Sequence, residues 1–253
     1  MTSAATTVAV KQEIPAQSSS WALPAVAAVL VVGMLGYLQI APLDDIEQRL
    51  LVPDQIAART LEHIRLVAVS TVVVIAIGVP LGVLLSRPRA RLLATPVLAV
   101  ANGGQAVPSI GVLVLLAILV GVGFTMAVVA LVAYALLPIL RNTMVGLQQV
   151  DRALIDAGRG MGMSARQVLM QIELPVAVPV MLAGIRVALI LNVGVATLAT
   201  YTNAGGLGSF IESGIVFNRM PILLTGSVLT IALALLVDWL AGLVEHKLRP
   251  RGL

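Results

Sequence analysis

The chain has 253 residues, of which 59% are hydrophobic and 11% charged, and its mean hydropathy is +1.03. A soluble core of this size cannot hide so much apolar surface, so the composition excludes an ordinary soluble domain and indicates a membrane protein. The net charge of +4 does not indicate nucleic-acid binding, because the basic residues form short clusters between apolar runs with few aromatic residues beside them. The lack of cysteine excludes disulfides, thiolate metal sites and thiol catalysis.

Uncharged runs of about 20 residues, the length of helix that crosses a bilayer core, predict an all-α protein with six transmembrane helices. The uncharged run 92–140 is too long for one crossing, so it is predicted to hold two spans with a turn at Gly121-Val122-Gly123. The other four predicted spans are residues 22–40, 66–86, 178–201 and 221–244.

The distribution of Lys and Arg predicts that both termini are cytoplasmic. This orientation puts four arginines outside: Arg49, Arg59, Arg65 and Arg219. It puts a larger basic set inside: Lys11, Arg87, Arg89, Arg91, Arg141, Arg152, Arg159, Arg166, Lys247, Arg249 and Arg251.

Four regions are predicted along the chain. Residues 1–20 form a polar cytoplasmic tail, and residues 21–60 form an anchor helix with an extracytoplasmic connection. The first apolar run has no clear cleavage site of small residues after it, so it is interpreted as a retained helix and not as a signal peptide. Residues 61–245 form the main transmembrane domain, and residues 246–253 form a basic cytoplasmic tail.

A charged, glycine-rich segment, residues 151–175, separates the fourth and fifth predicted spans. Gly160 and Gly162 can adopt the positive φ that ends a helix, and Ser164 with Gln167 has the spacing of a capping box that starts another. Pro175 is expected to end that second helix. The pattern predicts a pair of short helices protruding into the cytoplasm, although a solvated loop would use similar residues.

This segment resembles the signature of the integral membrane subunit of type I ABC importers, the binding-protein-dependent permeases. The signature has Glu-Ala-Ala, then Gly, then Ile-X-Leu-Pro further on, and this chain keeps every interval. The matching residues are Asp156, Ala157, Gly158, Gly162, Ile172, Leu174 and Pro175. Two of them depart from the pattern: Asp156 replaces Glu and keeps the charge, whereas Gly158 replaces Ala and favours a helix less by up to about 1 kcal/mol.

Stretches such as GQAVPS, RGMGMSARQ and NAGGLGSFI resemble the branch of this family that imports quaternary-ammonium osmoprotectants, namely glycine betaine, carnitine and choline. The resemblance covers most of residues 61–244. It implies a permease in the bacterial inner membrane. Related branches carry amino acids and other small solutes, so an importer of another solute stays open.

The resemblance implies that the segment 151–175 is a coupling loop that docks on a cytoplasmic ATPase, so that closure of the ATPase dimer moves the membrane helices. The residues to which it assigns this role are Asp156, Ala157, Gly158, Arg159, Gly162, Met163, Ser164, Leu174 and Pro175. It further implies two permease subunits, either copies or paralogues, and an extracytoplasmic binding protein. ATP and Mg would be bound by the ATPase, and this chain lacks the glycine-lysine phosphate loop that ATP binding requires.

The path of the solute is sought among polar residues inside the spans. Residues 92–121 are too long for a straight crossing, so a break is expected within residues 102–108, and a broken helix at membrane depth must face protein or a watery cavity. This makes Gln105, Pro108 and Ser109 candidate pathway residues, together with Asn192, Thr197 and Thr200 on the fifth span. The alternative is that these polar groups only bond neighbouring helices. With 3% aromatic residues, no cage for an ammonium group is evident, so selectivity is expected to rest largely with the binding protein.

Two further sets of residues are singled out. Asn203, Gly205, Gly206 and Gly208 follow the fifth span and are expected to form a flexible outer gate or simply to turn the chain. Arg186 and Asp238 fall at a similar depth in the fifth and sixth spans, which suggests a structural ion pair, since charges inside a membrane usually pair or reach toward the interface.

Two rival classes fit less well. An intramembrane serine protease needs a histidine near its serine in the bilayer, but His63 and His246 flank the spans on opposite sides, and Asp238 has no second aspartate for an aspartyl dyad. A secondary transporter, independent of ATP, would typically contain internal repeats, and none is visible. The sequence therefore predicts a non-catalytic transport subunit without a metal site.

Overall fold

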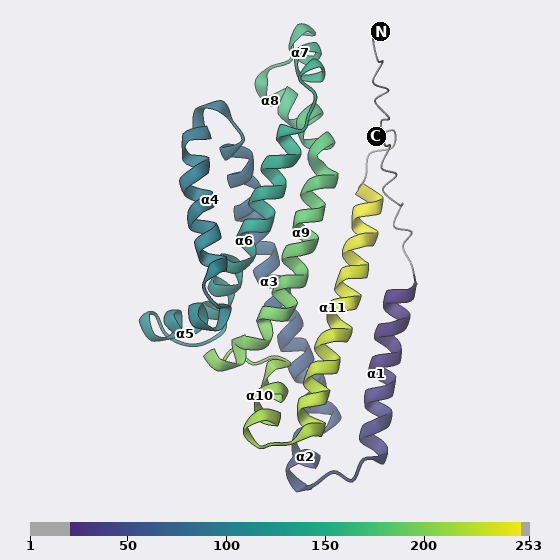
Figure 1. Ribbon diagram of the computed structural model, residues 1–253. Helices are drawn as coiled ribbons and strands as arrows, with labels where there is room; N and C mark the ends of the chain where they lie inside the picture. The colour runs from purple at the N-terminus through teal and green to yellow at the C-terminus, as the bar shows by residue number, and fades with distance from the viewer. Residues whose placement is uncertain (1–20, 249–253) are drawn as a thin grey trace, which may run out of the picture.

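The computed structural model describes residues 21–248, and every regular element within that range is a helix. The long helices lie side by side and run between two ends of the molecule (Figure 1). We call them the α7 end, which also carries α8, and the α10 end, which also carries α2. The predicted tail 1–20 and residues 249–253 of the second tail lie outside the described residues.

The helices follow one another along the chain with short connections. In order they are α1 (Ala22–Ile40), α2 (Asp45–Leu50), α3 (Pro53–Leu85), the short 3₁₀ helix η1 (Pro88–Ala90), α4 (Arg91–Ala106), α5 (Ser109–Leu119), α6 (Phe124–Gln148), α7 (Arg152–Gly160), α8 (Ala165–Val168), the π-helical turn η2 (Leu169–Glu173), α9 (Leu174–Ala196), the 3₁₀ helix η3 (Thr197–Thr202), α10 (Gly208–Val216) and α11 (Met220–Leu248).

The predicted count of six spans is met if a bent pair counts as one, because five single helices are long and apolar enough to cross a membrane. The bent pair is α4 with α5, whose axes differ by 98°. The predicted break within residues 102–108 is thus confirmed, at Val107-Pro108. The predicted turn before the next span is also confirmed, because Gly121 and Gly123 both have φ of +120°.

The centre of the bundle is α6, which packs along α3 on one side and along α9 on the other. Its close contacts depend on small residues in the neighbouring helices. A Cβ atom at Gly82 of α3 would lie 2.7 Å from Thr143 Cβ, and one at Gly184 of α9 would lie 2.8 Å from the carbonyl oxygen of Pro138. Small residues let membrane helices approach closely enough for dispersion forces to hold them, because lipid gives no hydrophobic drive to helix association.

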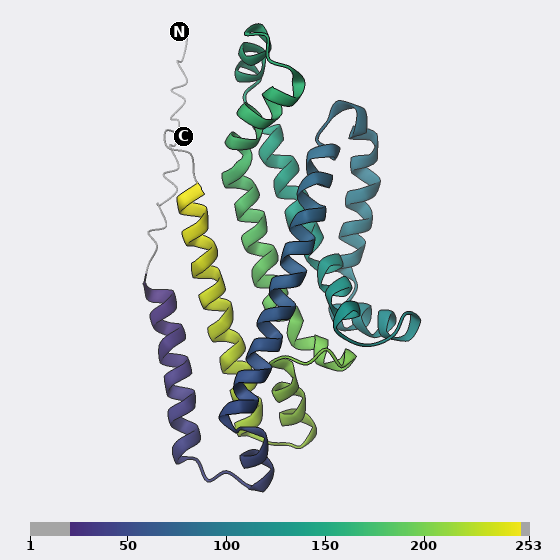
Figure 2. The ribbon, with the colours of Figure 1, turned by 180° about the vertical axis from the view of Figure 1, so that it is seen from behind.

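At the α10 end, α3 begins earlier than the predicted span. Pro53 stands at its first position, where proline needs no hydrogen-bond donor, so the helix starts well before the apolar run at Leu66. Leu51, between α2 and α3, is buried against Leu207 and Phe210. The connection from α1 therefore joins the apolar cluster at the α10 end, and Figure 2 shows it from behind, beside α10 and the start of α11.

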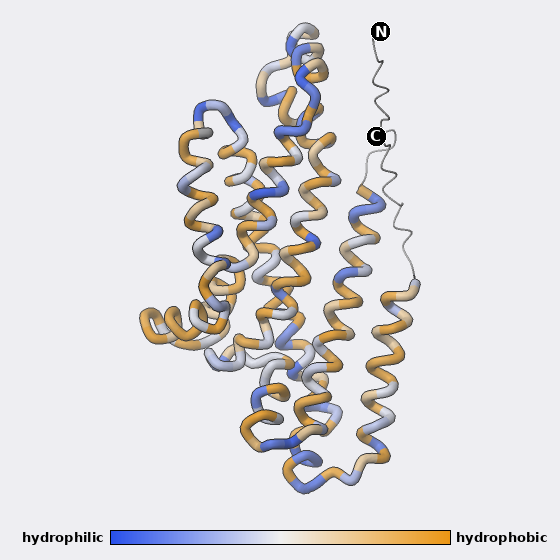
Figure 3. The backbone as a smooth tube through the Cα atoms, viewed as in Figure 1, coloured by the Kyte–Doolittle hydropathy of each residue, from blue (hydrophilic) through white to orange (hydrophobic). Residues whose placement is uncertain are grey.

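Hydropathy changes along the bundle in the way a membrane protein requires. The middle of the long helices is predominantly apolar, whereas polar residues gather around α7 at one end and around α2 and the α10–α11 connection at the other (Figure 3). The bundle therefore has an apolar belt with two polar ends.

Candidate coupling segment and transport region

The segment 151–175 protrudes from the bundle at the α7 end (Figure 1). The side chain of Asp151 caps α7 by accepting a hydrogen bond from the amide of Ala153 at 2.9 Å. At the other end of α7, Gly162 has φ of +85°, its amide donates to the carbonyl of Arg159, and the amide of Met163 donates to that of Gly158. This is a Schellman motif, which reverses the chain sharply and favours glycine at the left-handed position.

Ser164 starts the second short helix as predicted. Its hydroxyl accepts from the amide of Gln167, and the Gln167 side chain accepts from the amide of Ser164 at 2.8 Å, which completes a capping box. Two local expectations were wrong. Gly160 remains inside α7, so of these two glycines only Gly162 has positive φ.

The second wrong expectation concerns Pro175, which does not end a helix but lies in the first turn of α9. Helix continues from Ala165 to Thr202. A proline ring in a regular helix clashes with the carbonyl four residues before it. Here the preceding turn, η2, has widened to π-helical geometry and relieves that clash. The segment is thus joined without a break to α9.

The coupling-loop residues fall into an exposed set and a packed set. Asp156, Ala157, Arg159, Gly162, Ser164 and Pro175 are exposed, Met163 and Leu174 are half-buried, and Gly158 is buried. Gly158 faces Ile172: a Cβ atom there would lie 2.5 Å from Ile172 Cδ1. The glycine that departs from the resembled pattern is therefore the point where α7 packs on η2.

An ion pair that sequence reasoning missed holds the base of this segment. Arg87, between α3 and α4, contacts Glu173 of η2 twice, with Nη1–Oε1 at 3.1 Å and Nη2–Oε2 at 2.6 Å. The Glu173 side chain is only 8% exposed. A buried carboxylate needs a partner, so the charge of Glu173 within an otherwise apolar stretch was the signal that could have revealed it.

The candidate pathway residues of the bent pair lie near the bend. Gln105 donates through Nε2 to the carbonyl of Tyr134 in α6 at 2.9 Å, Pro108 is the N-cap of α5, and Ser109 is its first residue. Gln105 therefore ties α4 to α6, which is the helix-bonding alternative, whereas Pro108 is exposed at the bend.

The three candidates of the fifth span do not come together. Asn192 is fully buried and donates to Ser70 at 3.1 Å and to Thr71 at 3.3 Å, so it bonds α9 to α3. Thr197, the first residue of η3, donates to the carbonyl of Gly194 at the end of α9. Thr200 donates to a carboxylate oxygen of Glu212 in α10 at 2.8 Å. Sequence reasoning did not single out Glu212.

The proposed outer-gate residues form a turn held by α3. Asn203, Gly205 and Gly206 have φ of +56°, +76° and +92°. The amide of Gly206 donates to Glu62 Oε2 at 2.9 Å, and the amide of Leu207 donates to His63 Nδ1 at 3.3 Å. Gly208 lies against the Thr197 backbone so closely that a Cβ atom would not fit. Glu62 and His63 of α3 thus hold the turn in this conformation, and the sequence did not indicate either contact.

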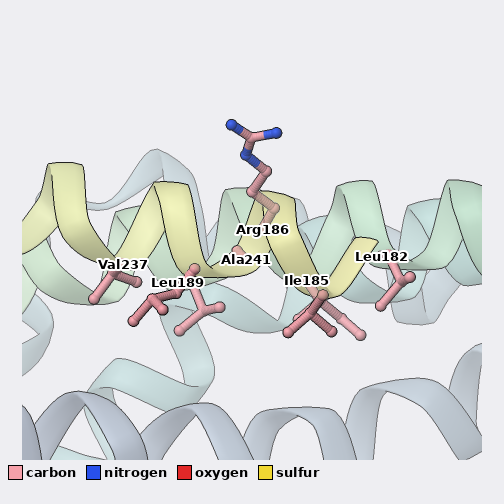
Figure 4. A pocket seen from close by; sticks show the side chains of 8 residues that line it. Leu182, Ile185, Arg186, Leu189, Val237 and Ala241 are labelled. Carbon is pink, nitrogen blue, oxygen red and sulfur yellow. The ribbon is translucent and has the colours of Figure 1, made fainter. Parts of the chain in front are cut away.

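Arg186 and Asp238 lie together as a hydrogen-bonded ion pair between α9 and α11, and Glu245 Oε2 lies 3.5 Å from Arg186 Nη1. Beside the pair is a cavity of about 300 Å³ lined by Leu182, Ile185, Arg186, Leu189, Val237, Leu240, Ala241 and Val244. The Arg186 guanidinium points away from the apolar side chains of this lining (Figure 4). The cavity therefore has little to bind a polar solute.

No group of three or more His, Cys, Asp or Glu side chains within residues 21–248 is arranged to hold a metal ion.

The bundle, the protruding capped segment and the paired intramembrane charges define a helical membrane transport subunit. The chain belongs to the family of binding-protein-dependent transport system inner membrane components, whose model matches residues 78–250.

Proteins similar to this chain are named as transport permeases. The carnitine transport permease protein OpuCB of Listeria monocytogenes is 40% identical over 196 residues, which are 77% of this chain and 88% of that protein. The osmoprotectant import permease protein OsmY of Salmonella typhimurium is 43% identical over 188 residues, 74% of this chain and 80% of that protein.

Among solved structures, the chain resembles inward-facing conformations of the MetNI methionine ABC transporter. The TM-score is 0.70 and the identity 25%, and the match covers 82% of this chain and all of the compared chain. The overall arrangement of helices is therefore that of an ABC importer permease.

Proposed function

We propose that this chain is the permease subunit of an ATP-driven importer for a quaternary-ammonium osmoprotectant: glycine betaine, carnitine or choline. The observation that carries the proposal is the agreement among the names of relatives. A third one, the glycine betaine/carnitine/choline transport system permease protein OpuCB of Bacillus subtilis, is 37% identical over 77% of this chain. The identity extends over the bundle and is not confined to a short motif.

The partners follow from this function. The exposed face of the segment 151–175 would dock on an ATPase subunit that binds ATP and Mg, and the α10 end would meet a binding protein that carries the solute. This assigns the α7 end to the cytoplasm. A second permease subunit, a copy or a paralogue, would complete the pathway. The exposed side chains Met161 and Leu154, 76% and 46% exposed, offer adaptable apolar contacts for the ATPase.

The coupling would be mechanical, and the continuous helix from Ala165 to Thr202 supports it. A displacement of the protruding segment would be passed along α9 to η3 and to the turn 203–207, which Glu62 and His63 hold through hydrogen bonds. The Arg87–Glu173 pair joins the same helix to the connection before α4, so the bent pair would move with it. Packed helices transmit such shifts because they slide between discrete arrangements.

An importer of an amino acid is the second candidate, and the similarity to the methionine transporter favours it. That identity is 25%, well below the identities of the osmoprotectant permeases, so we rank this candidate second. A carrier that works without ATP is disfavoured, because the chain belongs to a binding-protein-dependent family.

The test is uptake into proteoliposomes that contain the permease with its ATPase and binding protein. Radiolabelled glycine betaine, carnitine, choline and methionine are offered in turn, with ATP or with a non-hydrolysable analogue. We expect ATP-dependent uptake of at least one quaternary ammonium compound and none of methionine. Uptake of methionine alone would replace the proposed solute, and uptake that persists without ATP hydrolysis would contradict the ATP-driven mechanism.

A further inference from the structure

Glu212 of α10 differs from the carboxylates of α3, η2 and α11 that are paired with an arginine. Glu62, Glu173, Asp238 and Glu245 are each ion-paired with an arginine. Among the residues that the structure describes, Glu212 has no cationic partner, although its side chain is partly buried. An ionisable residue in a membrane bundle that is not neutralised by the protein marks a candidate site for a charged ligand or solute.

The carboxylate of Glu212 is held in place from one side. Thr200 of η3 donates to its Oε2 at 2.8 Å, and Ser209 Oγ lies 3.3 Å from Thr200 Oγ1. Oε1 receives no hydrogen bond within the described part of the chain. Because Gly208 packs directly on the backbone of Thr197, α10 is fixed against η3 and the carboxylate is pre-oriented. One oxygen is thus fixed and the other is free.

The cluster lies where two irregular parts of the bundle meet. Besides α10, η3 contacts α5, the second arm of the bent pair. Tyr201, next to Thr200, is 46% exposed. Irregular backbone inside a membrane is tolerated where it lines protein or a watery cavity. Both irregular elements and the unpaired carboxylate therefore occur together near the α10 end.

We propose that Glu212, positioned by Thr200, is a contact for the ammonium group of a cationic solute as it enters the membrane from the α10 end. The proposal rests on the proposed function and adds a residue that discriminates by charge. A trimethylammonium group has no N–H to donate, so it is attracted by a nearby negative charge and needs no directed hydrogen bond. Choline carries a net positive charge, whereas glycine betaine and carnitine carry a carboxylate that Glu212 would repel.

The first experiment uses the permease alone and exploits its lack of cysteine. Ser209→Cys places one thiol beside Thr200, and its labelling rates are compared for two methanethiosulfonates: a trimethylammonium reagent and a sulfonate reagent. Adding Glu212→Gln should lower the ratio of the two rates about tenfold, the effect of a unit charge about 5 Å away acting in opposite directions on the two reagents in a watery site. Asp45→Asn, which removes an exposed acid at the same end, should leave the ratio unchanged.

An unchanged ratio in the Glu212→Gln variant would overturn the proposal, and so would a thiol that neither reagent reaches. The second experiment measures uptake in the complete transporter. Glu212→Gln should reduce choline uptake about fourfold more than glycine betaine uptake, the effect of one unit charge about 5 Å away in a watery site, whereas an equal loss of both would contradict discrimination by charge. If the wild-type transporter carries none of these solutes while the labelling ratio still depends on Glu212, the osmoprotectant function fails and the cation site stands.

Discussion

Arg87 and Glu173 form a two-pronged ion pair that joins the connection between α3 and α4 to the base of the protruding segment 151–175. The two residues are far apart in the sequence and lie on different elements. Glu173 belongs to the π-helical turn that leads into α9, so the pair links the protruding segment with two membrane helices at once. In the proposed mechanism it is one contact through which a movement of α7 and α8 would reach the bent pair.

Breaking this pair should destabilise the protein. Arg87→Ala leaves the Glu173 carboxylate nearly buried without its cation, and we expect a loss of about 1 to 3 kcal/mol in stability, measured by thermal unfolding in detergent. Glu173→Gln should cost less, because the glutamine oxygen can still accept from the Arg87 guanidinium and the Arg87 side chain is one-third exposed. A larger effect of Glu173→Gln than of Arg87→Ala would contradict this account of the pair.

The two glycines at the tip should behave differently although they are two residues apart. Gly162→Ala forces an L-residue into the left-handed region and should destabilise the segment by about 1 to 2 kcal/mol. Gly160→Ala lies in helix with open space around it and should be neutral or stabilising by up to about 1 kcal/mol. Limited proteolysis of the segment measures both, and equal cleavage rates for the two variants would be inconsistent with the Schellman motif.

Restoring the alanine of the resembled signature should be tolerated. In Gly158→Ala the new Cβ meets the flexible ends of Ile172 and Met163, so the gain in helix propensity, up to about 1 kcal/mol, offsets the cost of moving those side chains. Gly158→Val adds branched bulk between α7 and η2 and should cost about 1 to 3 kcal/mol. Co-purification measures association with the ATPase, which should survive the change to alanine and weaken with the change to valine. Loss of association in the alanine variant would show that α7 packs on η2 too tightly to accept even one methyl group.

Removing Arg186 should destabilise the protein more than removing its partner Asp238. Arg186→Ala strands two carboxylates, Asp238 and Glu245, and should cost about 3 kcal/mol or more. Asp238→Ala leaves Arg186 with Glu245 at 3.5 Å and should cost less. The exchange Arg186→Asp with Asp238→Arg should recover part of the assembly lost in the single variants, as seen by size-exclusion chromatography. No recovery at all would indicate that the pair does not stabilise the bundle.

Much of the fold could be predicted because membrane helices can be recognised in a sequence as long apolar runs. The first span, Ala22–Ile40, matches its prediction at both ends, and the break before Ser109 followed from the excess length of one uncharged run. The ends of α3 and α9 were less predictable. Pro53 begins a helix in a polar stretch, and Pro175 is absorbed by a π-helical turn, which depends on packing that a local pattern does not contain.

In the candidate sites too, local features could be predicted from the sequence, whereas most contacts between distant segments could not. The capping box at Ser164 and the positive φ at Gly162 are local features and could be predicted from spacing. The contacts of Glu173, Glu212, Glu62 and His63 join segments distant in sequence, so composition alone could not pair them. Arg186 with Asp238 is the exception, because similar depth in adjacent spans restricts the partners of a membrane charge.

The most direct test of the central claim is ATP hydrolysis by the complete transporter in lipid nanodiscs, with and without binding protein loaded with glycine betaine. It is repeated with Gly162→Val, which distorts the tip, and with Gly160→Ala as the matched control. We predict that loaded binding protein stimulates hydrolysis in the wild type and in Gly160→Ala, and that Gly162→Val loses this response. An ATPase that never associates with the permease, or a response that Gly162→Val leaves unchanged, would contradict the assignment of the segment 151–175 as the coupling element.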